Sequence, residues 1–544
     1  MPPPFARIDL TRHDLDTLLA RARPALPDDA YRTLQALVDT FRYMTELLED
    51  QTTTIARLRQ ILLGATTEKT RQGLKQAGLA GGHTPGDPQG RHASRERPDR
   101  GHGRNGADAY GGARKIPVSH SSLTSGDRCP GCLKGKLYAG APGVLVRLVG
   151  QAPIAATVYE LEKLRCNLCG EVFTAAAPAG VGAEKYDPTA ASMIALLKYG
   201  NGLPFHRLAG LQASVQIPLP ASTQWDIVNE TAAAIQPALD ELIRQAADGQ
   251  VLHNDDTSMT VLSLLPTHSA ARDPAANDDV PPERTGVFTS GIVATREGHR
   301  LALFFTGRRH AGENLAAVLA HRTRELGPPI QMCDALSRNP PKALEVILVH
   351  CLTHARRHFV DVTPSFPAEC CYVLETLQDV YGYDAQARAQ GLSPDARLAF
   401  HHTHSGPLME ALHAWLTAQI DEHHVEPNSG LGEAITYFRK HWTKLTRFLE
   451  VAGAPLDNNI CERALKKAIL HRKNAYFYKT SNGAHVGDLF MSAIHSCELN
   501  GVGAFDYLTA LQRHARALKE TPSAWMPWNY RETRQPLDAS VDSG

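Results

Sequence analysis

The amino-acid sequence predicts a multidomain α/β protein, and three observations support this prediction. The chain has 544 residues, enough for several domains, and 43% of them are hydrophobic, as in globular proteins. The first 180 residues carry a heptad pattern, a basic segment and two cysteine pairs. Beyond residue 249, three strand-like segments precede a helical segment and a strand that ends in an acid. This last order is typical of a ribonuclease-H-like core.

The charge balance of the chain argues against a uniformly basic surface. There are 57 Lys and Arg residues and 57 Asp and Glu residues, so the formal net charge is zero. Any basic surface that binds nucleic acid must therefore be confined to one part of the protein. The sequence contains no run of about 18 apolar residues and no apolar stretch typical of a signal peptide. We therefore expect a cytoplasmic protein with no membrane partner.

The N-terminal segment, residues 1–70, is predicted to be helical and to contain a coiled coil. Within residues 31–63, nine positions alternate steps of three and four, and all but one are apolar. These positions are Leu34, Leu37, Phe41, Met44, Leu48, Gln51, Ile55, Leu58 and Leu62. The pattern predicts a homo-oligomer formed by self-pairing; the alternative is a helix that packs on the chain's own body.

Residues 71–115 change in composition and are predicted to be a disordered basic linker. Gly, Pro, His and Arg dominate, and nine Lys and Arg face four Asp and Glu, a local charge of +5 (9 − 4). The segment either contacts DNA phosphates or serves only as a spacer.

Residues 116–180 carry two cysteine pairs with metal-ligand spacing. They are Cys129-Pro-Gly-Cys132 and Cys166-Asn-Leu-Cys169, separated by strand-like segments. Four thiolates arranged as two such pairs can surround one tetrahedral Zn²⁺ ion. We therefore predict a zinc ribbon; the alternative is four reduced thiols.

Residues 181–248 are predicted to form a helical domain. A turn at residues 217–220 precedes a long helix that opens with Ser222, Thr223 and Gln224. In a helix-turn-helix reader these three side chains would face the DNA groove. A purely structural helical packet explains the pattern equally well.

The remaining segments are predicted to form the catalytic core and an insertion. Residues 249–362 supply the first part of the core, and residues 363–450 are helical and weakly patterned, as a helical insertion domain would be. Residues 451–515 complete the core with a late helix, and residues 516–544 form a C-terminal tail.

Three acids in the core segments are candidate catalytic residues. Asp255 lies in the first strand, Asp334 ends the fourth, and Glu462 lies in the first turn of the late helix. Carboxylates from separate elements can hold two Mg²⁺ (or Mn²⁺) ions about 3.5–4 Å apart for phosphoryl transfer. Asp256 is the alternative to Asp255, because neighbouring residues of a strand point to opposite faces.

The segment PLDNNICERALKKAILHRKN, residues 455–474, is the most informative part of the chain. Its Asp457-Asn458-Asn459 cluster predicts a turn and a helix N-cap. Glu462, Lys466 and Lys473 recur at helical spacing on one face, which suits a metal ligand beside a phosphate backbone. The alternative is an Asn-capped surface helix with a Glu-Lys pair.

Basic residues near these elements are candidates for phosphate contacts, although a solvated charged face is an equally good interpretation for most of them. They are Arg308, Arg309, Arg356, Arg357, Arg463, Lys466, Lys467, Arg472 and Lys473. The pair Cys351 and His354 could supply two zinc ligands, with Cys333 near in sequence. Because no fourth ligand is evident, a strand-to-helix turn with a buried thiol is the preferred interpretation.

The chain resembles bacterial insertion-sequence-66 family transposases over nearly all of its length. The motifs that carry the resemblance are LRQILLGATTEKT, GHGRNGADAYGGARKIPV, CPGC, CNLC, YGNGLPFHRLAGLQ, HNDDTSMTVL, HCLTHARRHFVDV, PLDNNICERALKKAILHRKN, NGVGAFDYL and WMPWNY. The resemblance implies a DDE transposase with a ribonuclease-H-like core, Mg²⁺ dependence and binding of transposon ends. It assigns the catalytic acids to Asp255, Asp334 and Glu462.

Two positions depart from the family pattern. The family usually has Asp-Glu-Thr where this chain has Asp255-Asp256-Thr257, which keeps an acid in place. It often has Asp-Gly-Tyr where this chain has Asp334-Ala335-Leu336, which keeps the acid but not the two residues that follow it.

The function implied by residues and resemblance together is metal-dependent cleavage of DNA 3′ ends followed by strand transfer. The partners would be double-stranded DNA, as transposon ends and as target, and accessory proteins of the same element. Two alternatives remain: a zinc-ribbon DNA-binding regulator with an inactive core, and a metal-dependent nuclease without strand transfer.

Overall fold

The computed structural model describes most of the chain beyond residue 183. Described are residues 19, 21–24, 30–31, 34–35, 38, 122–128, 130, 134, 136–138, 151–165, 172–178, 181, 184–265, 284–341 and 344–541. The chain divides into two compact units, residues 82–157 and the remainder. Among the described helices, none is both long and apolar enough to cross a lipid bilayer.

Several sequence predictions fall outside the described residues. The four knuckle cysteines, the linker over residues 71–115 and most of the heptad segment belong to this group. Of the nine heptad positions, Leu34 is described, and it packs against a small cluster formed by Leu19 and Val38.

A helical segment precedes the central sheet. It consists of α4 (Pro188–Ala195), the π-helical turn η2 (Leu196–Gly200), α5 (Phe205–Ser214) and α6 (Ala221–Ala247). Helix α6 begins one residue before the predicted Ser222. Gln224 is buried, and its Nε2 donates to the carbonyls of Leu219 (2.9 Å) and Phe205 (3.1 Å). The prediction that Gln224 faces a DNA groove is therefore wrong, because its amide bonds to the backbone of the preceding turn and of α5.

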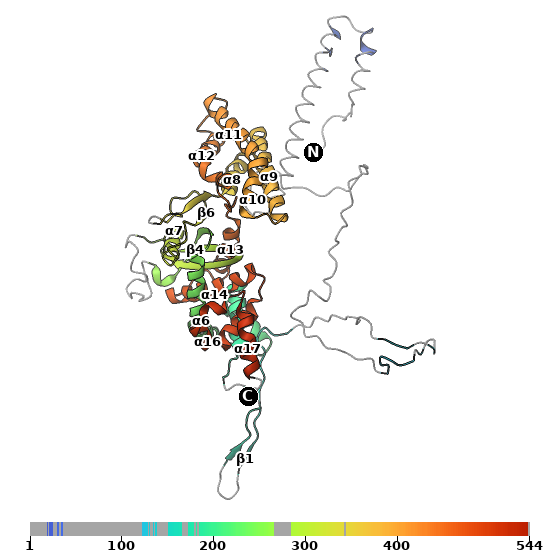
Figure 1. Ribbon diagram of the computed structural model, residues 1–544, viewed down its shortest axis with the longest axis vertical. Coiled ribbons are helices and arrows are strands. Elements are labelled where there is room, and N and C mark those ends of the chain that lie inside the picture. Colours follow the sequence, from blue (N-terminus) through green and yellow to red (C-terminus); the bar gives the residue numbers. More distant parts are fainter. Residues whose placement is uncertain are drawn as a thin grey trace. The chain divides into compact units, whose positions relative to one another are not determined.

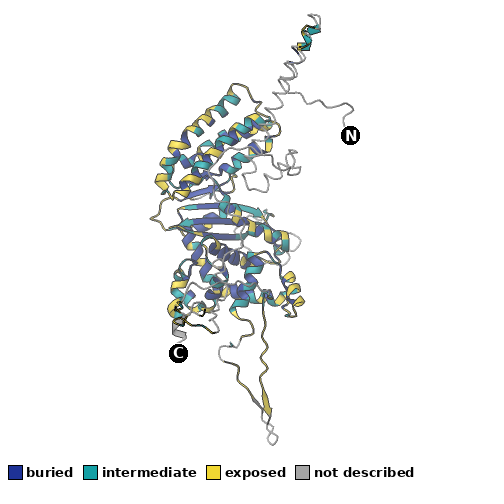
Figure 2. Ribbon diagram, turned by 90° about the vertical axis from the view of Figure 1, so that its right-hand side faces the viewer, coloured by how far each residue is buried: buried dark blue, intermediate teal, exposed yellow. Residues whose placement is uncertain are grey.

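A five-stranded mixed sheet forms the centre of the fold, with strand order β5-β4-β3-β6-β7. The strands are β3 (Val251–Ser258), β4 (Phe288–Arg296), β5 (His299–Gly307), β6 (Ile330–Cys333) and β7 (Ile347–His350). The pairs β3–β4 and β4–β5 are antiparallel, and β3–β6 and β6–β7 are parallel. Glu297 and Gly298 join β4 to β5 with φ angles of 50° and 83°, as a two-residue type I′ hairpin requires. Figure 2 shows that the strands of this sheet are largely buried.

Helices flank the sheet on two opposite sides (Figure 1). Helix α7 (Ala311–Leu319) connects β5 to β6, and α8 (Leu352–Val362) follows β7. The region predicted as an insertion is helical: α9 (Pro367–Ala389), α10 (Pro394–His404), α11 (Gly406–Asp421), α12 (Gly430–Leu445) and the 3₁₀ turn η5 (Arg447–Leu449). The apolar faces of α9, α11, α12 and η5 share one buried cluster with β6, β7 and α8. The helices thus extend the core of the sheet and leave their outer faces exposed (Figure 2).

The last part of the chain returns to the sheet. Its elements are α13 (Asn459–Ala475), α14 (Ser481–Leu499), α15 (Ala504–Arg513), α16 (Ala515–Glu520), the 3₁₀ turn η6 (Pro522–Trp525) and α17 (Tyr530–Val541). Helix α13 packs on β3 and β4, whereas α14 packs along β5.

Helix α14 covers the outer edge of β5 with a row of polar side chains. Asn500, Ser496, Ser492 and Asp488 accept the backbone N–H groups of alternate β5 residues at 3.2, 2.9, 3.0 and 2.6 Å. The N–H donors, in the same order, are those of Arg300, Ala302, Phe304 and Thr306. Four residues of helix rise about 6 Å and two residues of strand about 6.6 Å, so the two spacings match along the edge.

We predict that Ser492→Ala destabilises the core by about 1–3 kcal/mol, because the buried N–H of Phe304 loses its acceptor. The thermal midpoint should fall, and hydrogen exchange of β5 should accelerate. Ser214→Ala is the matched control: Ser214 is exposed and bonds within its own helix, so we expect a change below about 0.5 kcal/mol. Equal effects from both substitutions would contradict the edge-covering role of Ser492.

Candidate active site: a carboxylate cluster between β3, β6 and α13

Asp255 lies in the central strand, on the face covered by α13. Its strand partner is Gly291 of β4, and paired residues point to the same face. A Cβ on Gly291 would lie 3.0 Å from Leu465 Cδ2, so α13 packs closely on this face. One oxygen of Asp255 accepts the backbone N–H of Asp256 at 2.8 Å.

Asp256 points to the other face of the sheet and has its own partners. Its oxygens contact His310 Nδ1 and Arg338 Nη2, each at 3.0 Å, and its side chain is 1% exposed. His310 is the N-cap residue of α7, so Asp256 joins this helix to the sheet. Neighbouring residues of β3 point to opposite faces of the sheet, so Asp255 and Asp256 lie on different faces. This distinguishes the two candidates for the first catalytic acid.

Asp334 follows β6 directly and lies level with Asp255. In the parallel register, His253 pairs with Met332, and each acid lies two residues further along its strand. The two carboxylates therefore leave the same face of the sheet at neighbouring positions. Asn339 Nδ2 and the backbone N–H of Leu336 donate to Asp334 Oδ1, which holds the carboxylate on its loop.

Glu462 lies in the first turn of α13, whose N-terminus is fixed to β3 by Asn458. Asn458 Nδ2 donates to the carbonyl of Asn254 at 3.1 Å, and its Oδ1 lies 3.2 Å from His253 Nδ1. The buried Glu462 Oε1 has no hydrogen-bond partner among the described residues and lies 3.8 Å from His354 Nδ1. A buried carboxylate oxygen without a donor suits a position that receives a cation.

The electrostatics of Asp255 reflect the three acids together. Burial and the negative charges of Asp334, Asp256 and Glu462 together raise the pKa of Asp255 to about 7, against the hydrogen bond from the Asp256 N–H. Negative charges that raise the pKa of a neighbouring carboxyl favour binding of a divalent cation, because the ion removes the repulsion. Carboxylate oxygens such as those of Asp255, Asp334 and Glu462 are the donors that Mg²⁺ and Mn²⁺ prefer.

The basic candidates on α13 differ in their surroundings. Arg463, Lys466 and Lys473 are exposed. Lys467 instead pairs with Glu498 (Nζ–Oε1 2.8 Å). Arg472 donates to the hydroxyls of Thr257 (3.2 Å) and Ser258 (2.6 Å) at the end of β3.

The basic candidates outside α13 are less exposed. Arg308 donates from Nη2 to the carbonyl of Leu264 at 3.0 Å, which uses part of its guanidinium within the fold. Arg309, Arg356 and Arg357 are half-buried.

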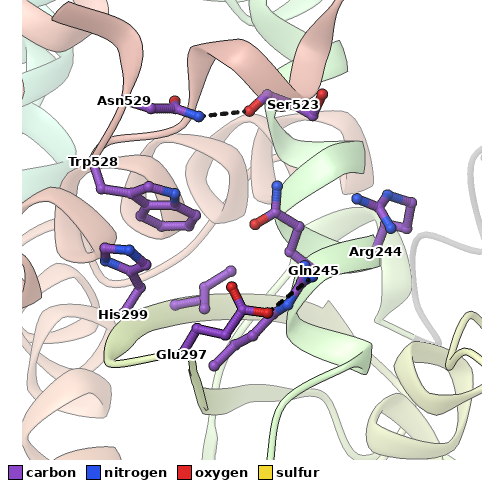
Figure 3. Close-up of a pocket in the computed structure, with 9 residues that line it drawn as sticks. Arg244, Gln245, Glu297, His299, Ser523, Trp528 and Asn529 are labelled. Atoms are coloured by element: carbon purple, nitrogen blue, oxygen red, sulfur yellow. Dashed lines mark hydrogen bonds and ion pairs between the residues drawn. The ribbon is translucent and has the colours of Figure 1, made fainter. Parts of the chain in front are cut away.

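A separate polar pocket of about 300 Å³ lies near the β4–β5 turn (Figure 3). Arg244, Gln245, Glu297 and Asn529 contribute to its lining. The His299 ring stacks against Trp528 with ring centroids 4.6 Å apart. Arg296, at the end of β4, is five residues from Gly291, roughly 16 Å along the strand. The pocket is therefore not part of the carboxylate cluster.

Sequence reasoning missed several residues that hold the cluster together. Asn458 was predicted as capping chemistry, but its side chain makes no cap hydrogen bond and joins α13 to β3 instead. Asn339 holds Asp334, and its carbonyl accepts from Asn254 and Gln331. The two consecutive amide residues Asn458-Asn459 were the available sequence signal for Asn458. No sequence pattern pointed to Asn339.

Comparisons with known proteins identify the family of this chain. The family described as Transposase IS66 family matches residues 184–486, which include all three acids. Three Sinorhizobium fredii proteins, each described as uncharacterized, are similar to this chain. They are y4jD (27% identical over 63% of this chain), y4hP (24% over 74%) and y4qI (25% over 62%). The matches cover 65%, 73% and 61% of those proteins, less than two thirds of y4jD and y4qI. The family match spans more than half of the length of this chain, so the chain belongs to the IS66 family of transposases.

Proposed function

We propose that this protein is a DDE-type DNA transposase that cleaves the 3′ ends of an insertion sequence and joins them to target DNA. The observation that supports this most strongly is Asp255, whose pKa is raised by its burial and by the charges of Asp334 and Glu462 from two other elements. Three carboxylates that converge on one face of a mixed sheet, beside an exposed basic helix, suit a metal-dependent reaction on a phosphodiester. Family membership is consistent with the same chemistry.

The sheet supports the proposed ribonuclease-H-like core. Its first three strands are antiparallel neighbours, and the next two extend it in parallel on the other side of β3. This is the order that the sequence predicted, with the acids on β3, after β6 and on a late helix that packs on the same face. Helices α9–α12 correspond to the predicted insertion between the second and third acids.

Asp255, Asp334 and Glu462 are the residues that would hold Mg²⁺ or Mn²⁺. A bound ion pair supplies stabilisation of charge on the reacting phosphate oxygens. The chain's own contribution is positioning. Asn339 fixes the Asp334 carboxylate, and Asn458 fixes the start of α13, the helix that carries Glu462 and packs on β3.

The exposed face of α13 is the proposed contact to the DNA backbone beside the cluster. We predict that Lys466→Ala weakens binding of end DNA several-fold. The plot of log affinity against log salt should become less steep by about 0.9, because one phosphate contact is lost. Filter binding or fluorescence anisotropy at several salt concentrations measures both quantities. Lys467→Ala is the control: Lys467 pairs with Glu498, so its loss should leave the salt slope unchanged. Identical slopes for wild type and Lys466→Ala would exclude the contact.

Other parts of the proposal rest on sequence alone. We propose that Cys129, Cys132, Cys166 and Cys169 hold one structural Zn²⁺ ion and that residues 31–63 form a coiled coil between copies of the chain. The reaction would take place on double-stranded DNA in the cytoplasm. Accessory proteins of the same element remain an expectation from the family resemblance.

Strand transfer with the purified chain, Mg²⁺ and DNA that carries the flanking repeats tests the proposal directly. The expected products are nicked 3′ ends and joined target DNA. Cut ends without joined product would favour a nuclease, and end-specific binding without any cleavage in Mg²⁺ or Mn²⁺ would favour a DNA-binding regulator.

A further inference from the structure

Glu462 belongs to a second group of potential metal ligands besides the carboxylates. Cys351, at the N-terminus of α8, and His354, one turn later, face the first turn of α13. One ligand atom from each of Cys351, His354 and Glu462 lies within 4.8 Å of the other two. A thiol, an imidazole and a carboxylate at this separation need only small side-chain rotations to share one ion.

The donor types favour a softer ion than Mg²⁺. Thiolate and imidazole ligands select Zn²⁺ over Mg²⁺, and three protein ligands with one open position describe many zinc sites in enzymes. Cys351 is 1% exposed, whereas the His354 and Glu462 side chains are 22% and 25% exposed. The sulfur therefore lies at the base of the group, and the other two ligands lie nearer to solvent, where an ion can enter.

One backbone donor to the Cys351 sulfur is of the kind that accompanies metal-bound thiolates. The backbone N–H of Asn458 donates to Cys351 Sγ at 3.2 Å, from the residue that also fixes α13 to β3. Such donors to a ligand atom orient it and stabilise its negative charge. The thiol of Cys461 acts instead as a hydrogen-bond donor, to the carbonyl of Gly291 at 3.3 Å.

We propose that Cys351, His354 and Glu462 form a Zn²⁺ site that is distinct from the Mg²⁺ site and shares Glu462 with it. Binding of Zn²⁺ releases the proton of the Cys351 thiol to solvent and leaves a thiolate on the ion. The ion then binds the Glu462 carboxylate, which the proposed Mg²⁺ site also requires. The regulatory consequence, which rests on the proposed function, is that Zn²⁺ inhibits DNA cleavage by withholding Glu462 from Asp255 and Asp334.

Spectroscopy with Co²⁺ tests the site without any DNA substrate. The full chain carrying Cys129→Ser and Cys166→Ser serves as background, so that the predicted zinc ribbon contributes little. Addition of Co²⁺ should produce a thiolate-to-Co²⁺ charge-transfer band in the near ultraviolet, and Zn²⁺ should displace it. In this background Cys351→Ser should remove the band, whereas Cys461→Ser, a matched buried thiol on α13, should keep it.

A second variant covers the case in which Cys351→Ser does not fold. His354→Ala keeps the thiol but removes one ligand, so the band should persist with a metal affinity lowered by about 10–100-fold. A band that is absent from the background protein, or that survives Cys351→Ser, overturns the site. A metal affinity that His354→Ala leaves unchanged overturns the assignment of that ligand.

The cleavage assay separates failure of this inference from failure of the proposed function. With Mg²⁺ in excess, stoichiometric Zn²⁺ should lower the cleavage rate of the wild-type chain at least tenfold. The Cys351→Ser and His354→Ala variants, each compared with its own zinc-free rate, should resist Zn²⁺. Equal inhibition of all three proteins overturns the regulatory role. Absence of cleavage in every protein, with the Co²⁺ band intact, rejects the proposed function and leaves the metal site established.

Discussion

Replacement of Glu462 by glutamine should lower cleavage and strand transfer by about three orders of magnitude or more. Glutamine keeps the size and polarity of the side chain but removes the charge that a hard Mg²⁺ ion requires, and loss of several kcal/mol of stabilisation corresponds to a rate loss of this size. Gel-based assays of nicking and of joined product measure both steps. Binding of end DNA should survive, because Lys466 and Lys473 remain exposed on the same helix.

A matched control separates this effect from a general effect of removing an acid near a helix N-terminus. Glu433 is an exposed glutamate in the first turn of α12, the position that Glu462 occupies on α13. Glu433→Gln should therefore retain nearly full activity. Full strand-transfer activity in the Glu462→Gln protein would exclude Glu462 as a metal ligand and would favour the DNA-binding regulator.

Asp255→Asn should abolish cleavage to a similar extent and, unlike most core substitutions, should stabilise the metal-free protein. Asp255 has its pKa raised from 3.8 to about 7 by burial and by Asp334, Asp256 and Glu462. A raised carboxyl pKa means that stability is highest when the group is protonated and falls as pH rises from about 4 to about 7. The asparagine protein lacks this loss, so its advantage should grow from pH 5 to pH 8 and reach roughly 2 kcal/mol.

Thermal unfolding in EDTA at several pH values measures this difference. Asp488 also has a pKa raised to about 7 by burial, but it is present in both proteins and cancels in the comparison. Asp256→Asn should behave in the opposite way: it leaves His310 and Arg338 without their carboxylate and should destabilise the fold by about 1–3 kcal/mol. Loss of cleavage in Asp256→Asn together with normal cleavage in Asp255→Asn would reverse the assignment of the first acid.

The order of elements could be predicted from the sequence because it depends on local patterns. Short strand-like runs separated by a loop and a turn predict β3, β4 and β5, and the absence of helix breakers after Asn459 predicts α13. The position of Asp334 at the end of a short strand follows from the same reasoning. These patterns do not depend on which segments meet in space.

The contacts that bring the site together could not be predicted in this way. Asn458 bonds to residues of β3 that are 204 and 205 positions away in the chain. Nothing in the sequence near Cys351 and His354 indicated that the third ligand atom would come from Glu462, because α9–α12 separate them along the chain. The sequence left the role of Gln224 open for the same reason, since its partner Phe205 lies on another helix.

The row of polar side chains on α14 has a consequence for how copies of this chain can associate. An open strand edge invites another strand to pair with it, which leads to domain swapping or to aggregates. Here the outward N–H groups of β5 are already bonded to Asp488, Ser492, Ser496 and Asn500. Higher assemblies therefore cannot grow by adding strands at β5 while α14 is in place. Detachment of α14 alone would expose this edge, so agents that loosen that helix should cause aggregation before the sheet itself unfolds.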